Sequence, residues 1–312
     1  MSPTRSPQQT DRALWIVVAF VLLLGGCNDK GVDGGEPPRV IPYVEYLSTS
    51  HVDDYVYFIF GGDTTYAKGL WRYNLNGQEP PQLIAPGAFN GAVSPCGNAV
   101  AYNSYGHLWL VRLPAGEPLS GTPELLLDAV NDGGVTDVNW RDCNHVLFSP
   151  NATSGIVELD LETRAIDTLL DYGRLATASA DGAVIAFIDR QNVFVLEDGM
   201  IDSLTAFAAK EGASDPHISA NGREIVYSHL WPTDTTRHTS YNLDIEVIDV
   251  KTRARRTVAL LGKFPTWTRH DSILYQNADT LHLREIWITD SDGHAHRPVL
   301  TYDTFLEWLQ TE

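Results

Sequence analysis

SPCGNAVAYNS, residues 94–104, joins a turn signal to a short apolar segment that ends in an aromatic residue. Pro95 and Gly97 are residues that tight turns prefer. The segment that follows them, AVAY, is short and apolar, as a buried strand is. Whether this combination occurs once or returns at a regular spacing decides the fold, because self-similarity at a fixed period is the signature of repeat architectures.

The combination returns along the chain. Short apolar segments end in an aromatic residue at Phe58, Tyr102, Phe148, Phe187, Tyr227 and Tyr275. Neighbouring members of this series stand between 39 and 48 positions apart. One apolar segment precedes each aromatic segment and two follow it, so every repeat contains four predicted strands. A period of this size predicts a propeller or a solenoid.

Hairpin chemistry separates the predicted strands. Asp181-Gly182 and Asn221-Gly222 supply the positive φ angles that tight hairpins require. Many strands are apolar on both faces, as expected when each sheet lies between two others. No helical period is visible between residues 42 and 300, and residues 304–310 fit either a short helix or a last strand. We therefore predict an all-β domain over residues 42–312, a six-bladed β-propeller of four-stranded antiparallel blades.

Three of the repeated segments resemble a known signature. SPCGNAVAY at 94–102, SADGAVIAF at 179–187 and SANGREIVY at 219–227 resemble the Ser-Pro-Asp-Gly-x-x-Ile-Ala-Tyr signature of TolB-type propeller repeats. Residues 140–148 and 267–275 depart from that signature because they lack the glycine. The resemblance implies the fold and leaves the activity open, because such propellers serve both as scaffolds and as domains of unrelated enzymes.

The N-terminus has the pattern of a secretory signal. Arg5 and Arg12 precede the apolar run 13–24, which is shorter than the roughly 20 residues that a membrane-spanning helix needs. The run ends in Leu-Gly-Gly-Cys, which resembles the lipobox of bacterial lipoproteins and implies cleavage before Cys27 and acylation of that residue. The alternative is an ordinary signal peptide with a chance cysteine.

These boundaries predict a signal peptide over 1–26, a flexible tether over 27–41 and a membrane anchor through lipid. The tether contains NDKGVDGGEPP, whose Gly, Pro and charged residues form no packed element. Asn28 follows the cysteine, where an Asp would resemble the signal for retention in the inner membrane. We therefore expect the cell envelope as location, with the periplasmic face of the outer membrane favoured over the inner membrane.

The chain is strongly acidic. It carries 40 acidic and 22 basic residues, a formal net charge of −18. This charge repels phosphate backbones, so we expect no nucleic-acid partner. It favours cationic partners or divalent ions. We expect no cofactor, with a divalent cation left open.

Two cysteines remain once Cys27 carries lipid. Cys96 and Cys143 form an even pair, and an oxidising envelope permits a disulfide between them. Both stand in the turn after the inner strand of consecutive blades. Packed sheets lie about 10 Å apart, whereas a disulfide needs Cα atoms within about 7 Å. The two turns differ in sequence, so a disulfide and two separate thiols both stay open.

The propeller topology predicts a candidate binding face. Each inner strand begins on the same side, which we call the loop face, and the tight turns after the inner strands lie on the opposite turn face. Residues near the inner-strand starts should gather at the channel: Asn90, Asp137, Asp215 and His217. The longest insertion, 228–242, adds further binding-type side chains: His229, Trp231, Arg237, His238 and Tyr241. The alternatives are a structural His217 and an insertion without function.

The sequence contains no Gly-x-Ser-x-Gly elbow, phosphate-binding loop or Cys-x-x-Cys motif. This favours a non-enzymatic scaffold that binds an envelope protein or a peptidoglycan-associated partner. The alternative is a carbohydrate-active propeller, lyase or hydrolase, that uses acidic and His residues at the channel mouth. Carboxylates or His converging on one pocket would support that alternative, whereas a channel lined by apolar and small residues would remove it.

Overall fold

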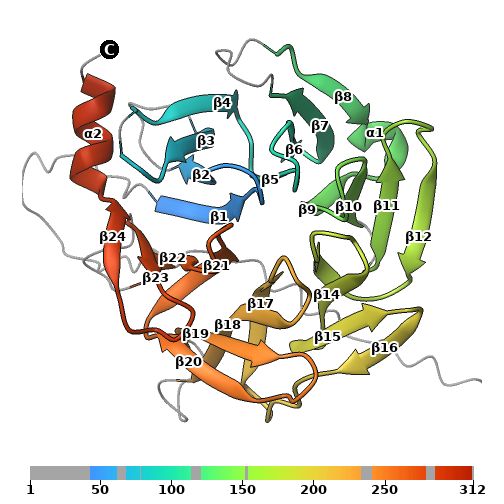
Figure 1. The fold of residues 1–312 in the computed structure, drawn as a ribbon. Coiled ribbons are helices and arrows are strands. Elements are labelled where there is room, and N and C mark those ends of the chain that lie inside the picture. The colour runs from blue at the N-terminus through green and yellow to red at the C-terminus, as the bar shows by residue number, and fades with distance from the viewer. Residues whose placement is uncertain are drawn as a thin grey trace, which may run out of the picture. The chain divides into compact units, whose positions relative to one another are not determined.

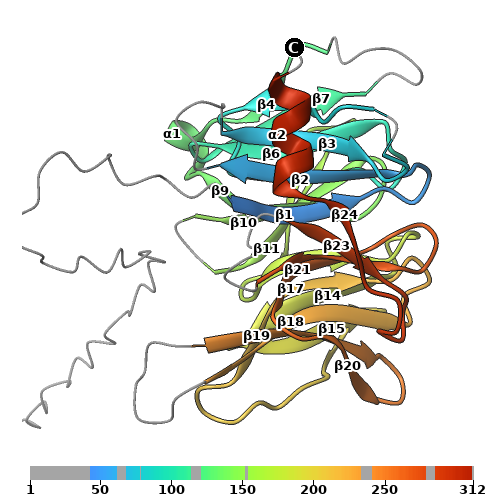
Figure 2. The ribbon, with the colours of Figure 1, turned by 90° about the vertical axis from the view of Figure 1, so that its left-hand side faces the viewer.

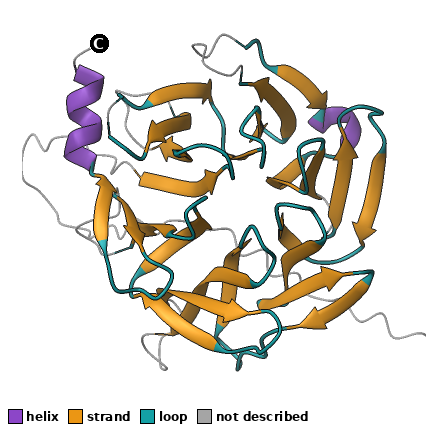
Figure 3. Cartoon of the chain, viewed as in Figure 1, coloured by secondary structure: helices purple, strands orange, loops and turns teal. Residues whose placement is uncertain are grey.

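The predicted six-bladed β-propeller is confirmed. The computed structural model describes residues 43–61, 68–77, 79–113, 121–151, 154–232, 241–278 and 285–310. These residues form six four-stranded antiparallel sheets, arranged in a ring (Figure 1). Strands dominate, and the two helices lie at the outside of the ring (Figure 3).

Each blade is built from four consecutive strands, numbered from the channel outward. Blade 1 contains β1 (Tyr43–Thr49), β2 (Tyr55–Gly61), β3 (Gly69–Asn74) and β4 (Gln82–Pro86). Blade 2 contains β5 (Asn90–Val93), β6 (Ala99–Ser104), β7 (His107–Arg112) and β8 (Glu124–Leu127). Blade 3 contains β9 (Val135–Trp140), β10 (His145–Pro150), β11 (Ile156–Asp160) and β12 (Ile166–Leu170).

The second half of the ring repeats this order. Blade 4 contains β13 (Arg174–Ala178), β14 (Val184–Asp189), β15 (Asn192–Glu197) and β16 (Met200–Ser203). Blade 5 contains β17 (Gly212–Ile218), β18 (Glu224–Pro232), β19 (Tyr241–Asp249) and β20 (Arg255–Ala259). Blade 6 contains β21 (Gly262–Trp267), β22 (Ile273–Asn277), β23 (Ile286–Thr289) and β24 (Arg297–Leu300).

The repeated aromatic residues occupy equivalent places, as predicted. All six lie on the second strand of their blade and are at most 5% exposed: Phe58, Tyr102, Phe148, Phe187, Tyr227 and Tyr275. Several stand opposite another aromatic residue on the third strand; Phe187, for example, stacks on Phe194 with ring centroids 5.5 Å apart. Aromatic cross-strand pairs of this kind stabilise a sheet.

The hydrophobic core is divided among the seams between blades. Successive side chains of a strand point to opposite faces, so Phe58 of β2 packs toward blade 6 whereas Tyr57 and Ile59 pack toward blade 2. Six buried clusters result, one for each pair of neighbouring blades. This arrangement explains why so many strands are apolar on both faces.

A C-terminal helix closes the ring. Residues 304–310, for which the sequence left helix and strand open, belong to α2 (Tyr302–Gln310), which lies beside blades 1 and 6 (Figures 1 and 2). Its Phe305 is 2% exposed and lies 4.4 Å from Phe60 and 5.3 Å from Trp71 between ring centroids. Because the described strands include none that is shared between the first and last blades, this contact fastens the end of the helix to the first blade.

A second, four-residue helix escaped the sequence analysis. α1 (Ala129–Asp132) begins after Asp128, whose side chain accepts a hydrogen bond from the Val130 N–H, and ends at Gly133 with φ of 81°. These are ordinary caps, but four residues are too few to show a helical period. Among the described residues, no helix has the length and apolar character needed to cross a membrane.

A disulfide crosses the seam between blades 2 and 3. It joins Cys96, in the turn after β5, to Cys143, in the turn after β9, and the two Cα atoms lie 5.6 Å apart. The separation is below the general spacing of packed sheets, because these two turns approach one another at the turn face. Of the two possibilities that the sequence left open, the structure has the bridge.

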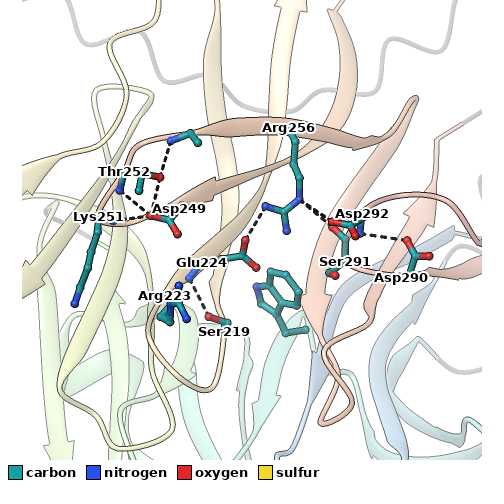
Figure 4. Close-up of polar contacts among 12 residues, drawn as sticks. Ser219, Arg223, Glu224, Asp249, Lys251, Thr252, Arg256, Asp290, Ser291 and Asp292 are labelled. Atoms are coloured by element: carbon teal, nitrogen blue, oxygen red, sulfur yellow. Dashed lines mark hydrogen bonds and ion pairs between the residues drawn. The ribbon is translucent and has the colours of Figure 1, made fainter.

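Arginine side chains cross other seams on the turn face. Arg269 of blade 6 donates to Asp54 at 2.7 Å and to the carbonyl of Val52 at 2.9 Å, both in blade 1. Arg256 of blade 5 pairs with Glu224 at 2.6 Å and donates to the carbonyl of Ser291 in blade 6 at 3.1 Å (Figure 4). Further arginines link blades 2–3, 3–4 and 4–5: Arg164 to Glu124, Arg141 to the Gly182 carbonyl and Arg253 to Asp202.

The helix contact leads to a stability prediction. Replacing Phe305 by alanine removes a buried ring from the contact between α2 and blade 1 that closes the propeller. We therefore expect the free energy of unfolding to fall by about 3–5 kcal/mol. Urea denaturation followed by tryptophan fluorescence measures this change. Glu307→Ala, at an exposed position of the same helix, should change stability by less than about 0.5 kcal/mol. Equal effects of the two substitutions would contradict the closing role of α2.

Candidate binding site at the mouth of the channel

Five of the six inner strands share a local irregularity. The pairing with the second strand shifts register in β1, β9, β13, β17 and β21. At each shift one non-glycine residue has a positive φ between 49° and 55°: Tyr46, Asp137, Leu175, Asp215 and Phe264. This left-handed conformation is uncommon for side-chain-bearing residues and costs of order 1–3 kcal/mol. Bulges of this kind re-aim side chains.

Blade 2 differs from the others. Its inner strand β5 pairs with β6 without a register shift, and Asn90 occupies the position that the bulged residues hold elsewhere. We call the six equivalent residues the channel ring: Tyr46, Asn90, Asp137, Leu175, Asp215 and Phe264. In Figure 1 the inner strands that carry them surround the centre of the propeller.

The channel ring encloses a small cavity. Its volume is about 70 Å³, and its lining consists of the ring residues with those that follow them on the inner strands. Typical small-molecule pockets have about 300–1,000 Å³. The cavity therefore has room for a few waters or for the tip of one side chain. The structure brings Asn90, Asp137, Asp215 and His217 together in this lining.

Two carboxyl groups in the lining have raised pKa values. Burial raises the pKa of Asp215 to about 6, the negative charge of Asp137 adds to the shift, and a hydrogen bond from the Ser214 hydroxyl at 2.9 Å opposes it. Burial also raises the pKa of Asp137, against the positive charge of Arg174 and the Thr136 hydroxyl. The protein thus holds two partly desolvated carboxyl groups near enough to affect one another.

His217 serves the structure. Burial lowers its pKa to about 3, so the imidazole is neutral at physiological pH. Its Nδ1 accepts a 3.5 Å hydrogen bond from the Trp267 N–H, and its carbonyl accepts one from the Trp267 indole at 3.1 Å. These contacts tie blade 5 to blade 6. In the part of the chain that the structure describes, no group of three or more His, Cys, Asp and Glu side chains could hold a metal ion.

The residues expected in the long insertion do not all lie in a loop. His229 and Trp231 belong to β18, because the β18–β19 hairpin continues to the pair Pro232–Tyr241. His229 Nδ1 lies 3.0 Å from a Glu246 carboxylate oxygen, and the Trp231 indole donates to Asp244 at 2.8 Å. Both side chains are therefore engaged within blade 5.

The structure leaves some predicted residues without a description. Cys27, Arg237 and His238 lie outside the described residues, and so does the side chain of Tyr241, whose backbone begins β19.

Aromatic residues of the loop face escaped the sequence analysis. Tyr46 and Phe264 form a tilted pair in the channel ring, with centroids 5.0 Å apart. On blade 2, Tyr105 is 75% exposed and contacts Phe89 edge-on at 5.2 Å, and the Lys68 ammonium lies 4.2 Å from the centre of the Phe89 ring. A comparison of all six inner-strand starts could have found Tyr46 and Phe264, because the repeat aligns them with Asp137 and Asp215.

No protein-family model and no curated protein matches the sequence. Solved structures do match the fold. TolB from Acinetobacter baumannii has a TM-score of 0.58 at 17% identity, over 83% of this chain and 64% of that one. A putative TolB from Agrobacterium tumefaciens has a TM-score of 0.54 at 18% identity, over 71% of this chain and 82% of that one. The fold is a TolB-like six-bladed β-propeller.

The same fold occurs in an enzyme. An oligogalacturonate lyase in complex with manganese has a TM-score of 0.54 at 14% identity, over 86% of this chain and 80% of that one. Identities this low show a shared fold alone. This TolB-like propeller also spans less than two thirds of the Acinetobacter TolB, so its activity has to be argued from its own residues.

The raised pKa of Asp215 predicts a pH dependence of stability. The pKa of this carboxyl is 3.8 in the unfolded chain and about 6 in the folded protein, so below about pH 4 it is mostly protonated in both. Between these two pKa values the carboxyl ionises in the unfolded chain and stays protonated in the folded protein. The free energy of unfolding therefore falls as pH rises through this range. The shift corresponds to about 3 kcal/mol. Urea denaturation from about pH 4 to pH 7 should show this extra loss in the wild type relative to Asp215→Asn. Asp137, Lys263 and Arg174 also act on this group and remain in both proteins. Parallel curves would contradict the assignment.

Proposed function

We propose that this chain is a lipid-anchored protein of the cell envelope whose propeller binds a protein partner at the loop face, without catalysis. The observation that carries the proposal is the contrast between the two faces. The turn face is occupied by contacts between blades: the Cys96–Cys143 bridge and the arginine pairs that cross the seams. The loop face presents the channel ring and the exposed Tyr105.

The chemistry of the loop face supports binding. Tyrosine is among the residues that protein interfaces favour, because it supplies apolar area together with a polar tip. Tyr105 and Phe89 lie beside the blade whose inner strand contributes Asn90 to the cavity. An aromatic surface next to a small acidic cavity suits a partner that covers the first and inserts one side chain into the second.

A carbohydrate-active enzyme is the second candidate. It is supported by the convergence of Asp137 and Asp215 on one cavity, a raised-pKa arrangement that general acid catalysis also uses, and by the fold shared with an oligogalacturonate lyase. Two observations favour the binding role. The cavity is smaller than a pocket that encloses a sugar ring. His217 is a weak base because burial lowers its pKa to about 3, and its Nδ1 already accepts a hydrogen bond from the Trp267 N–H.

Site-specific photo-crosslinking tests whether the loop face binds a protein partner. A photoreactive residue in place of Tyr105 should give adducts with another envelope protein, because that side chain is exposed on the proposed interface. The matched control replaces Glu162, which is exposed in the turn between β11 and β12 on the turn face, and should give none. Adducts from the Glu162 position alone would contradict the proposal. Release of unsaturated sugar ends from oligogalacturonate, abolished by Asp215→Asn, would replace it with the lyase.

The membrane anchor has its own test. Cys27→Ser removes the residue that the lipobox pattern predicts to be acylated. We expect the wild type to incorporate an acyl-chain analogue and to sediment with membranes, and the variant to lose both properties because hydrophobic burial of the chains provides the attachment. Cys96→Ser together with Cys143→Ser is the control and should keep the label. An unlabelled wild type would contradict the anchor.

A further inference from the structure

We propose that the channel ring binds a primary alkylammonium group, such as the end of a lysine side chain. The inference rests on the proposed binding function and specifies the chemistry of the ligand. It is argued from the two carboxylates, the aromatic pair and one unsatisfied amide that line the same cavity.

The carboxylates supply the charge. Asp137 and Asp215 line the cavity from blades 3 and 5, and within the described residues neither has a Lys, Arg or His partner at ion-pair distance. Their hydrogen-bond partners are hydroxyls: Thr136 at 3.4 Å from Asp137, and Ser214 at 2.9 Å and Ser228 at 3.5 Å from Asp215. A buried carboxylate without a cation is unfavourable, so a cation entering the cavity would stabilise both.

The aromatic rings supply the second half of an ammonium site. Tyr46 and Phe264 line the cavity from the neighbouring blades 1 and 6, and blade 6 follows directly after blade 5, which carries Asp215. An ammonium group is attracted to the face of an aromatic ring, and several rings around one cation form the cages that recognise amines. The alkyl chain of a lysine would contact the same rings through its methylene groups.

Asn90 provides an independent sign of a missing partner. Asn90 as a whole residue is 7% exposed and lines the cavity, and its side-chain oxygen Oδ1 is buried without a hydrogen-bond partner among the described residues. A buried acceptor left unpaired costs about 1–3 kcal/mol. An ammonium group has three N–H donors, enough to serve Asn90 together with the two carboxylates.

Size and charge limit the ligand further. A cavity of about 70 Å³ admits the tip of a side chain. The charged groups near the lining are Glu45, Lys68, Lys263 and Arg174. Lys263 and Arg174 lower the pKa of Asp215 through their charge, Arg174 also lowers that of Asp137, and Glu45 interacts with Asp215, Lys68 and Lys263. Two of these basic groups, Lys263 and Arg174, oppose a cation, so the site favours a ligand that adds contacts with the rings over a bare ion.

The direct test uses butylammonium as the probe and butanol as its neutral counterpart. Ring resonances of the intact protein with labelled Tyr and Phe should shift in a saturable way with butylammonium and stay unchanged with butanol. Asp137→Asn with Asp215→Asn should weaken the binding about tenfold or more. Asp198→Asn, which removes an exposed charge in the turn between β15 and β16, should leave it unchanged. Equal shifts with butanol, or an undiminished affinity of the double variant, would overturn the inference.

Lower pH and calcium give two further readouts. Affinity for butylammonium should fall as pH drops through about 6, because Asp215 becomes protonated. Calcium should compete weakly at best; a tight calcium site that excludes butylammonium would overturn the inference in favour of a metal ion. Asparagine in place of both aspartates keeps the side-chain shape, and a dispersed spectrum of that variant verifies that it is folded.

A last pair of outcomes separates this inference from the proposed function. If Tyr105 crosslinks to a partner whose lysine acetylation reduces the yield, the ammonium comes from that partner. If the yield is insensitive to acetylation while butylammonium binds, the site takes a free amine. Crosslinking without butylammonium binding would overturn the ammonium site and leave the binding face standing. Butylammonium binding without any crosslink would support the site and contradict a protein partner.

Discussion

Every blade of this propeller has two apolar faces, and both are covered only when the ring is closed. The constraint is visible within β2, where Phe58 packs toward one neighbouring blade and Tyr57 toward the other. Each blade consists of consecutive strands, so in the part of the chain that the structure describes no strand is shared across the seam between blades 6 and 1. Burial of Phe305 between aromatic residues of blade 1 takes that place. A single helix at the end of the chain therefore supports the burial on which all six seams depend.

Closing the ring also creates the channel and its strain. Six inner strands converge on one axis, and five of them bulge at the same position, with positive φ at residues such as Asp137 and Asp215. The backbone would be relaxed without these bulges. The bulged residues contribute carboxyl and aromatic groups from different blades to one small cavity, and the unbulged blade 2 adds the Asn90 amide. Strain that recurs at the same position around a ring and lines one cavity is typical of a functional site.

The two faces of the propeller differ in the contacts that they carry. On the turn face, arginine pairs and the Cys96–Cys143 bridge connect adjacent blades and resist their separation. The loop face carries fewer such contacts among the described residues and presents the cavity together with the exposed Tyr105. Because the contacts between blades gather on the turn face, a partner can bind the loop face without disturbing the contacts that keep the ring closed.

The sequence by itself determined the repeat, the blade count and the aromatic residues of the second strands, because strand periodicity and turn chemistry are local and recur six times. It also identified Asn90, Asp137, Asp215 and His217 as neighbours, since topology alone places the starts of inner strands together. Tertiary structure decided the rest. The role of His217 beside Trp267 and the helix that closes the ring depend on contacts between blades. The bulges and the extension of β18 through His229 and Trp231 depend on how the strands of one blade pair. Local sequence carries no record of such contacts, because the partner residues lie tens to hundreds of positions away.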